Sequence, residues 1–453
     1  MMNQTDKNQA NQFMKTRPVF GLLMSMSVPM IISMLIQSLY NIVDSIYVSR
    51  LGTQALTAVS LAFPLQNIST SVAIGMGVGI TSAISIHLGA GSAEKANRSA
   101  TIGVALAAVH CLIFVVFGLL ATRPFLMLFT RDEQTLTWAC QYTYIVVCVS
   151  FGCQLQLAME KIFQAVGSMK VTMVLLAAGC IINIILDPIL IFGLLGFPAL
   201  GIIGAAVATV IGQIAAFLLY IVVYHRKRKT FPVKIHPQYL HFDKAIIRQI
   251  YSVGIPSTIM LVLPSVLVSI LNSLLARFSD VYVAVLGVYF KLQTFIYMPA
   301  SGIVQGMRPI IGYNYGAGEY DRVKKVIRYS LLSAAVIMAV GTVAALGFPA
   351  QIFAMFDAEE ALLDAGISAL RIISLGFVIS TVGVIYSGTF EALGRGKDSL
   401  IVSLLRQFVI TIPLSFLLSG IMGADGVWLA FPISELCASV VAWILFWRVP
   451  NLG

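Results

Sequence analysis

Twelve long apolar segments dominate this 453-residue chain. A helix crosses the roughly 30 Å hydrocarbon core of a bilayer with about 20 apolar residues, and only short polar breaks separate these segments. Charged residues make up 11% of the chain and the mean hydropathy is +0.92, whereas soluble domains are about 25% charged. The sequence therefore predicts an all-α integral membrane protein with twelve transmembrane helices. Their approximate ranges are 18–48, 55–87, 97–122, 136–164, 169–193, 199–224, 245–277, 281–313, 325–348, 362–392, 398–420 and 424–447.

The basic residues predict the orientation, because loops rich in Lys and Arg stay in the cytoplasm. With the N-terminus inside, 22 of the 29 Lys and Arg residues fall on the cytoplasmic side. The other side receives only Arg50, Arg123, Arg131 and Arg277. We therefore expect both termini in the cytoplasm. The first seventeen residues are polar, and the long apolar stretch that follows lacks a small-residue cleavage pattern, so we expect no removable signal peptide.

The net charge of +10 is thus a topology signal, and no soluble segment is long enough to hold a nucleic-acid duplex. The GxGxG string of Gly75, Gly77 and Gly79 follows no strand, so close helix packing explains it better than dinucleotide binding. A phosphate loop near Gly394 would need other residues at Glu391 and Asp398. We therefore expect no nucleic acid, nucleotide or cofactor, and an ion gradient as the energy source. The six cysteines have no metal-ligand spacing and are interpreted as core residues.

The chain contains an internal repeat. A shift of 227 positions, shortened by five near the end, aligns identical residues through most of the apolar segments. The aligned residues include Pro29 with Pro256, Arg50 with Arg277, Gln66 with Gln293, Gly75 with Gly302, Gly79 with Gly306, Phe163 with Phe390 and Lys170 with Lys397. Six helices per copy give both copies the same orientation, the parallel repeat of many transporters.

The predicted organisation is a cytoplasmic tail (1–17), a first lobe (18–224), a basic linker (225–244), a second lobe (245–447) and a cytoplasmic C-terminus (448–453). We expect a cavity at the interface of the lobes, exposed to each side of the membrane in turn as the lobes rock.

Two acids within the apolar segments have no counterpart in the second copy. Asp44 aligns with Leu271, and Asp187 aligns with Leu414, so the fold accepts leucine at both positions. A charge within the bilayer costs about 2.5–3.5 kcal/mol even on the most lenient scale. Both acids therefore point to a function. The alternative is that Asp44 only accepts hydrogen bonds that fix neighbouring helices.

The residues around these acids suggest a cation or proton site. Gln37, Asn41 and Asp44 share one face of the first helix, and Asn183 and Asp187 lie one turn apart on the fifth. Pro188 has no N–H and so leaves the carbonyl of the preceding turn free. Carboxylate, amide and carbonyl oxygens together can hold a proton or transiently a small cation such as Na⁺. Because low dielectric favours the neutral acid, we expect proton exchange here.

Other polar residues within the segments have open interpretations. Glu160 faces the cavity or lies at the membrane interface beside Lys161, and Lys291 gates a cationic ligand or bonds to carbonyls. Gln66 and Gln293 line the cavity or pack helices, and Arg406 and Glu435 are expected to form a structural pair. The substrate-cavity candidates are Gln37, Tyr40, Asn41, Gln66, Glu160 and Gln293.

The stretches YNIVDSIYVSRLG, FQAVGSMK, NIILDPILIFG and GIIGAAVATVIG, together with the six-plus-six repeat, resemble the MATE family (multidrug and toxic compound extrusion) and within it the bacterial exporters of the MepA type. The resemblance covers essentially the whole chain. It implies a monomer in the bacterial inner membrane that exports organic cations by antiport with H⁺ or Na⁺. It also implies a cation site at Asp44, Asn183 and Asp187, with Thr209 as a further member. Some family members use acids in the seventh and tenth helices, where this chain has none at depth.

Two other functions are weighed against export. A flippase for lipid-linked sugars has the same fold, but its anionic substrates require cavity Arg and Lys, which are few here. A membrane enzyme requires His or metal clusters, and His110 is the only His well inside a segment, with no evident partner in the sequence. An assay of ethidium transport, compared with an assay of lipid flipping, would distinguish the exporter from the flippase.

Overall fold

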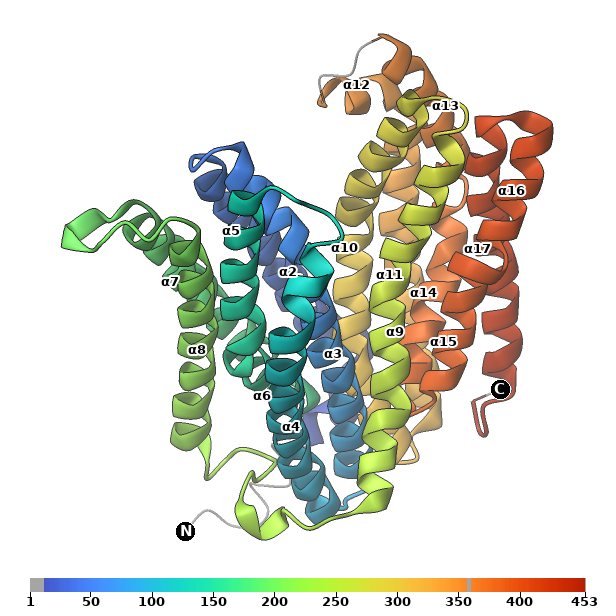
Figure 1. The fold of residues 1–453 in the computed structure, drawn as a ribbon. Coiled ribbons are helices and arrows are strands. Elements are labelled where there is room, and N and C mark those ends of the chain that lie inside the picture. Colours follow the sequence, from blue (N-terminus) through green and yellow to red (C-terminus); the bar gives the residue numbers. More distant parts are fainter. Residues whose placement is uncertain (1–11, 357–359, 453) are drawn as a thin grey trace. The chain divides into compact units, whose positions relative to one another are not determined.

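The computed structural model describes residues 12–356 and 360–452, and all regular elements among them are helical (Figure 1). The prediction of an all-α protein is confirmed for this part of the chain. Residues 1–11 of the predicted N-terminal tail lie outside it. The first half contains α2 (Val19–Ser49), α3 (Thr53–Gly89), α4 (Ala93–Leu126), α5 (Glu133–Thr143), η1 (Tyr144–Cys148), α6 (Phe151–Ala165), α7 (Met169–Phe192), η2 (Leu194–Gly196) and α8 (Ile202–Lys227). The second half contains η3 (Pro237–Tyr239), α9 (Lys244–Leu275), α10 (Asp280–Gly316), α11 (Tyr320–Gly347), α12 (Pro349–Ala354), α13 (Glu360–Ser374), α14 (Phe377–Ala392), α15 (Gly396–Leu404), η4 (Leu405–Val409), α16 (Thr411–Met422) and α17 (Ala424–Trp447).

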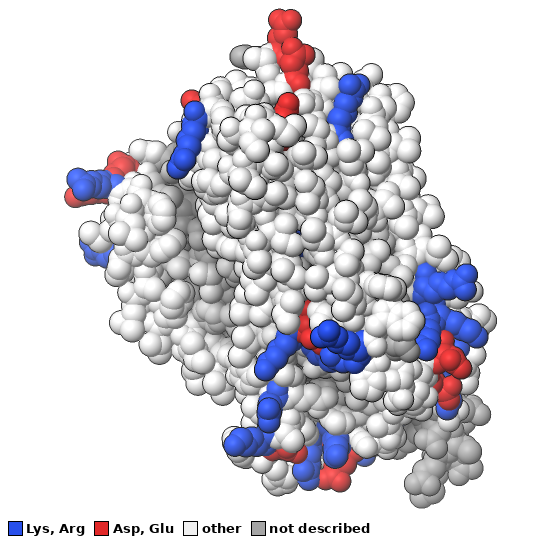
Figure 2. All heavy atoms as spheres, turned by 90° about the vertical axis from the view of Figure 1, so that its right-hand side faces the viewer, with Lys and Arg blue, Asp and Glu red and all other residues white. Residues whose placement is uncertain are grey.

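The helices provide ten to twelve membrane spans within the described residues. Ten are long and apolar enough to cross a bilayer, and two bent pairs raise the number to twelve when each pair counts as one span. On the face drawn in Figure 2, charged side chains gather toward the two ends and leave a broad, largely uncharged band between them. Such a band is the surface that a bilayer requires. The protein is therefore a multi-span membrane protein.

The fourth and tenth predicted spans are broken rather than straight. The helices of the fourth span meet at 41° between Cys148 and Phe151, after the π-helical turn η1, and those of the tenth meet at 52° between Ser374 and Phe377. The two breaks are close to equivalent in the repeat, because Phe151 aligns with Val378. A π-turn and a glycine at Gly376 are recognised causes of helix bending, and neither alters the apolar pattern from which the spans were predicted.

The five-residue shortening of the repeat lies in a single connection. In the first half, α7 ends at Gly193 in the left-handed conformation (φ 74°), and the chain reaches α8 only after η2 and Gly201. In the second half, Gly423 alone (φ 65°) joins α16 to α17. Glycine adopts these positive φ values without the steric cost that a side chain adds. The connection changes length while the helices on either side remain aligned.

By residue contacts the chain divides into two compact units. Unit 1 holds Ile32–Thr258 and the described residues before Lys15, and unit 2 holds Lys15–Ile31 and the described chain from Ile259 onward. The divisions fall inside α2 and α9 at equivalent positions of the repeat, since Ile31 aligns with Thr258. The predicted lobes, 18–224 and 245–447, follow the boundaries of the sequence repeat, whereas units 1 and 2 are defined by contacts between residues. The first part of α2, which belongs to the first repeat, therefore lies in unit 2. The first part of α9, which belongs to the second repeat, lies in unit 1.

Repeated glycines explain why these helix parts pack where they do. In unit 1, a Cβ on Gly79 would lie 2.2 Å from the carbonyl oxygen of Ile250 on α9. In unit 2, a Cβ on Gly306 would lie 2.7 Å from the backbone nitrogen of Ser27 on α2. Only glycine allows two backbones to approach so closely. The structure thus confirms that the glycine string of α3 serves helix packing.

Candidate functional site

Four residues predicted for the cation site come together in unit 1. Asn183 and Asp187 lie one turn apart on α7, with exposed fractions of 2% and 0%. Thr209 on α8 is also buried, and Asn183 Nδ2 donates a hydrogen bond to Thr209 Oγ1 at 3.4 Å. Asp44 on α2 is half-buried and interacts electrostatically with Asp187. Two carboxyl groups therefore share one largely buried site.

These carboxyl groups have no basic partner in the described part of the chain. None of its seven ion pairs includes Asp44 or Asp187. Both oxygens of Asp187, Oδ1 of Asp44 and Oδ1 of Asn183 are buried and accept no hydrogen bond from another residue of the described chain, while the two carboxyl groups lie within hydrogen-bonding range of each other. Two neighbouring carboxylates in a low-dielectric site repel each other unless a proton or a cation neutralises them. The free oxygens are also the atoms that a hard cation prefers as ligands.

Two tyrosines complete the site, and only one of them belongs to the sequence prediction. Tyr40 on α2 and Tyr142 on α5 both lie within electrostatic range of Asp44 and Asp187. Tyr142 is 3% exposed. It occurs in a run of mixed polar and aromatic residues without a periodic signal, so only the packing of α5 against the neighbouring helices reveals it.

The remaining cavity candidates differ in burial, and their role in a substrate cavity stays a prediction. Gln37 and Asn41 are exposed on α2, and Gln66 is half-buried on α3. Gln293 belongs to unit 2, where its side chain interacts with Tyr289. The shared helix face predicted for Gln37, Asn41 and Asp44 therefore carries one half-buried acid and two exposed amides.

Glu160 belongs to a separate, internally paired network on α6. Lys161 Nζ donates to Glu160 Oε1 and to Gln164 Oε1, each at 3.0 Å, and Gln164 Nε2 donates to Glu160 Oε1 at 2.9 Å. All three side chains are buried. Glu160 is thus neutralised by its own neighbour, unlike Asp44 and Asp187.

In unit 2 the acid at depth also has a partner. Arg406 Nε lies 2.6 Å from Glu435 Oε1, and its guanidinium lies 5.6 Å from the centre of the Tyr297 ring. The expected pairing of Arg406 with Glu435 is confirmed. Lys291 is exposed on α10.

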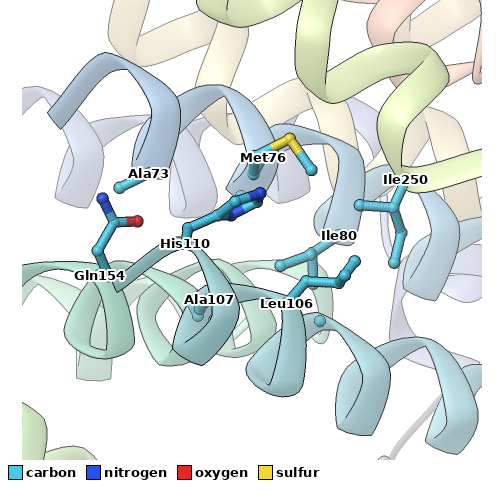
Figure 3. A pocket seen from close by; sticks show the side chains of 11 residues that line it. Ala73, Met76, Ile80, Leu106, Ala107, His110, Gln154 and Ile250 are labelled. Carbon is cyan, nitrogen blue, oxygen red and sulfur yellow. The ribbon is translucent and has the colours of Figure 1, made fainter. Parts of the chain in front are cut away.

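His110 has a partner that the sequence analysis did not identify. Its Nε2 lies 3.0 Å from the Tyr251 hydroxyl on α9, 141 residues away. This partner lies on another helix and is not evident in the sequence. Figure 3 shows His110 beside a small cavity with Met76 and Gln154 among its lining residues. Its volume of about 10 Å³ suffices for roughly one water molecule and not for a substrate.

No group of three or more His, Cys, Asp or Glu side chains could hold a metal ion in residues 12–356 and 360–452. The transient Na⁺ predicted at Asp44, Asn183 and Asp187 would use amide and carboxylate oxygens and stays a prediction.

A duplicated set of membrane-spanning helices, with an uncompensated acidic site in one copy, defines a membrane transporter rather than an enzyme. Comparison with known proteins supports this class. The MatE family model matches residues 29–189 and 256–417, so the chain belongs to the MatE family.

Relatives and solved structures match along nearly the whole chain. The multidrug export protein MepA of Staphylococcus saprophyticus is 26% identical over 440 residues, covering 97% of this chain and 96% of that protein. MepA of Staphylococcus aureus strain NCTC 8325 is 28% identical over 446 residues, with 97% and 96% covered.

Among solved structures, an outward-facing multidrug resistance MATE transporter of the MOP superfamily has a TM-score of 0.88 at 25% identity, covering 96% of this chain and 97% of that one. A MOP superfamily transporter from Pyrococcus furiosus, described as having a binding pocket of reverse polarity that suggests a different function, has a TM-score of 0.88 at 25% identity and 96% coverage of both chains.

Proposed function

We propose that this protein exports organic cations, including drugs and dyes, in exchange for H⁺ or Na⁺. Membership of the MatE family and similarity to proteins named multidrug exporters support the substrate class. The observation that carries the coupling proposal is the pair Asp44 and Asp187, which share a site and have no basic partner in the described chain. Such a site attracts a cation when ionised and releases it when neutralised.

The cycle alternates the exposure of this site between the two sides of the membrane. A bulky cation from the cytoplasm binds under the attraction of the ionised acids. Protons or Na⁺ from outside then neutralise Asp44 and Asp187, which weakens the attraction and releases the drug. Asn183, one turn from Asp187, and its hydrogen-bond partner Thr209 supply neutral oxygens to the incoming ion. No resident cofactor enters this cycle.

The available gradients are large enough to drive it. Moving one charge through 100 mV is worth about 2.3 kcal/mol, and one pH unit adds about 1.4 kcal/mol. Exchange of one proton for one monovalent drug moves no net charge, so in that case the pH gradient alone drives export. Exchange of two protons for one drug would also use the membrane potential.

The orientation and assembly belong to the same proposal. We place both termini in the cytoplasm of a bacterium, with the protein in its inner membrane, because 22 of 29 Lys and Arg residues then face inward. We expect it to act as a monomer surrounded by lipid, without nucleotide or nucleic acid.

The polarity of the site favours cation export over flipping of lipid-linked sugars. An anionic head group requires uncompensated Arg or Lys within the site. In unit 1 the buried cation Lys161 is paired with Glu160, and in unit 2 Arg406 is paired with Glu435. The charges without an ion-pair partner at the largely buried site of unit 1 are acidic.

The test is drug efflux from proteoliposomes under an imposed pH or sodium gradient. Asp44→Asn and Asp187→Asn should each lose gradient-driven ethidium efflux by at least about tenfold, since each removes a titratable group that the cycle requires. Asp364→Asn is the matched control, because Asp364 is an exposed acid on α13 outside the site. Parental efflux by Asp44→Asn under both gradients would refute the coupling assignment.

A further inference from the structure

The end of α8 carries a run of cations that neither the fold nor the proposed transport cycle uses. Arg226, Lys227, Arg228 and Lys229 are consecutive and all exposed. None forms an ion pair within the described residues. A topology signal explains why such charges stay on one side of the membrane. The topology signal does not explain why the chain on both sides of Arg226–Lys229 is packed in a defined position.

Part of this run continues the lipid-facing side of the helix. Leu218 and Val222 are 53% and 45% exposed on a membrane-spanning segment, where exposed leucine and valine face lipid. Arg226 follows Val222 by four residues on α8, so it lies on the same helix face, and Lys227 to Lys229 follow at the end of the helix. The charged group of Arg226 is therefore directed toward the polar border of the surrounding lipid. Long basic side chains at helix ends commonly extend to this level.

The linker after the run is fixed to unit 1. The backbone N–H of Lys234 donates to Asn97 Oδ1, and that of Ile235 donates to the Tyr224 hydroxyl, each at 2.7 Å. Phe231 and Val233 are buried in the same core as Phe163 and Tyr220, residues of the helical body. Because the chain is held on both sides of the run, the backbone that carries the four charges has a defined place at the end of α8.

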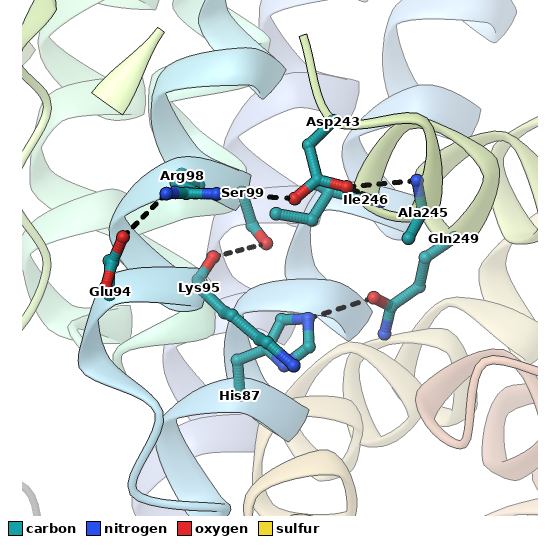
Figure 4. A network of polar contacts seen from close by, with 9 residues as sticks. All are labelled: His87, Glu94, Lys95, Arg98, Ser99, Asp243, Ala245, Ile246 and Gln249. Carbon is teal, nitrogen blue, oxygen red and sulfur yellow. Dashed lines mark hydrogen bonds and ion pairs between the residues drawn. The ribbon is translucent and has the colours of Figure 1, made fainter. Parts of the chain in front are cut away.

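No acid of the linker neutralises the run. Asp243 is the only acidic residue between His225 and Lys244. Its Oδ2 lies 3.7 Å from Arg98 Nη1, and its Oδ1 accepts a hydrogen bond from the N–H of Ala245 at 3.0 Å. Figure 4 shows Asp243 engaged with Arg98 and with the start of α9.

The same linker exposes apolar side chains, which indicates a lipid surface rather than water. Leu240 and Phe242 are 52% and 88% exposed between η3 and α9. Apolar side chains combined with clustered cations are the two signals that bind a segment to an anionic membrane surface. Both occur here within twenty residues of one another.

We propose that Arg226–Lys229 forms a binding site for the phosphate of anionic phospholipid head groups, such as phosphatidylglycerol, in the leaflet at the C-terminal end of α8. Arg226 and Arg228 supply paired N–H donors that match phosphate oxygens, and Lys227 and Lys229 add charge. In the orientation proposed above this is the cytoplasmic leaflet, which is the more anionic one. The inference depends on the protein lying in a membrane and not on the transport cycle.

The test uses the full-length protein purified in detergent and stripped of lipid. Native mass spectrometry measures retention of phosphatidylglycerol and, in parallel, of phosphatidylcholine. The variant Arg226→Gln/Lys227→Gln/Lys229→Gln should bind phosphatidylglycerol at least about tenfold more weakly, because each basic residue near an anionic lipid contributes about fivefold. Phosphatidylcholine retention should not change.

Two controls separate this site from a general effect of charge. Lys324→Gln/Lys325→Gln/Arg328→Gln removes the same residue types from exposed positions of α11, outside the linker with its exposed Leu240 and Phe242, and should weaken binding several-fold less than the linker variant. Arg226→Lys keeps the charge and should retain most of the binding. Equal losses in both triple variants, or unchanged retention in the linker variant, would overturn the proposal.

Discussion

Arg406 and Glu435 form a largely buried ion pair in unit 2, with 2.6 Å between Arg406 Nε and Glu435 Oε1. The aligned residues of unit 1 are Gly179 and Gln213, so the first copy has no such pair. Unit 1 instead carries Asp187 where unit 2 carries leucine. The second copy thus supplies the counter-ion for its acid, whereas the first leaves its acids to be neutralised by an ion from solution. This difference is the physical reason to assign ion coupling to the first copy.

Removing one member of the pair should cost more stability than replacing both. Arg406→Met leaves Glu435 as an uncompensated buried acid and should lower the free energy of unfolding by about 3–5 kcal/mol. The double variant Arg406→Met/Glu435→Leu should be close to the parent. Denaturant unfolding in mixed micelles measures both. A single variant no less stable than the double would show that the pair is not desolvated.

Gly79→Ala should destabilise the contact between α3 and α9. Its Cβ would lie 2.2 Å from the carbonyl oxygen of Ile250, so the two helices must separate. We expect a loss of about 1–3 kcal/mol in the free energy of unfolding. Gly287→Ala on α10 is the matched control, because a Cβ there meets nothing within 4 Å and alanine favours a helix by about 1 kcal/mol. Equal effects of the two substitutions would contradict the packing argument.

The span number, the repeat and the grouping of Asp187 with Asn183 could be predicted from sequence. Hydropathy and a spacing of four residues are properties of a single helix, so no knowledge of the neighbours is needed. The self-comparison of the chain then separated Asp44 and Asp187 from residues that the fold itself requires.

The exchange of helix parts between the units could not be predicted. α2 and α9 run without a break or a change of composition through Ile31 and Thr258, and the division depends on which glycine-bearing helix each part packs against. The pairing of His110 with Tyr251 and the place of Tyr142 beside the acids depend on tertiary contacts in the same way. Local patterns carry no information about such contacts.

Asp132 should make the stability of the α5 helix start depend on pH. Thr135 hydrogen-bonds the Asp132 carboxylate, with 2.8 Å from its N–H to Oδ2, and holds the pKa of this N-cap acid below its usual value. The stabilisation is fully present above the unfolded-state pKa of about 3.9 and is lost as the pH falls through the lower folded-state value. Asp132→Asn keeps a good N-cap without titration, so its thermal midpoint should fall less than that of the parent below about pH 4. If the thermal midpoints of the parent and of Asp132→Asn fell equally with pH, the Asp132 cap would not be formed.

Asn183 should distinguish a sodium-coupled cycle from a proton-coupled one. Its Nδ2 donates to Thr209, which leaves the buried Oδ1 without a hydrogen-bond partner beside Asp187. A sodium ion at this site requires that oxygen as a ligand, whereas a proton on Asp44 or Asp187 does not. Asn183→Leu should therefore reduce efflux driven by a sodium gradient by at least about tenfold and efflux driven by a pH gradient by less than about threefold, since one ligand contact is worth roughly 1–3 kcal/mol. Proteoliposomes with each gradient imposed separately measure both rates. Equal loss under the two gradients would mean that Asn183 positions Asp187 and does not bind the ion.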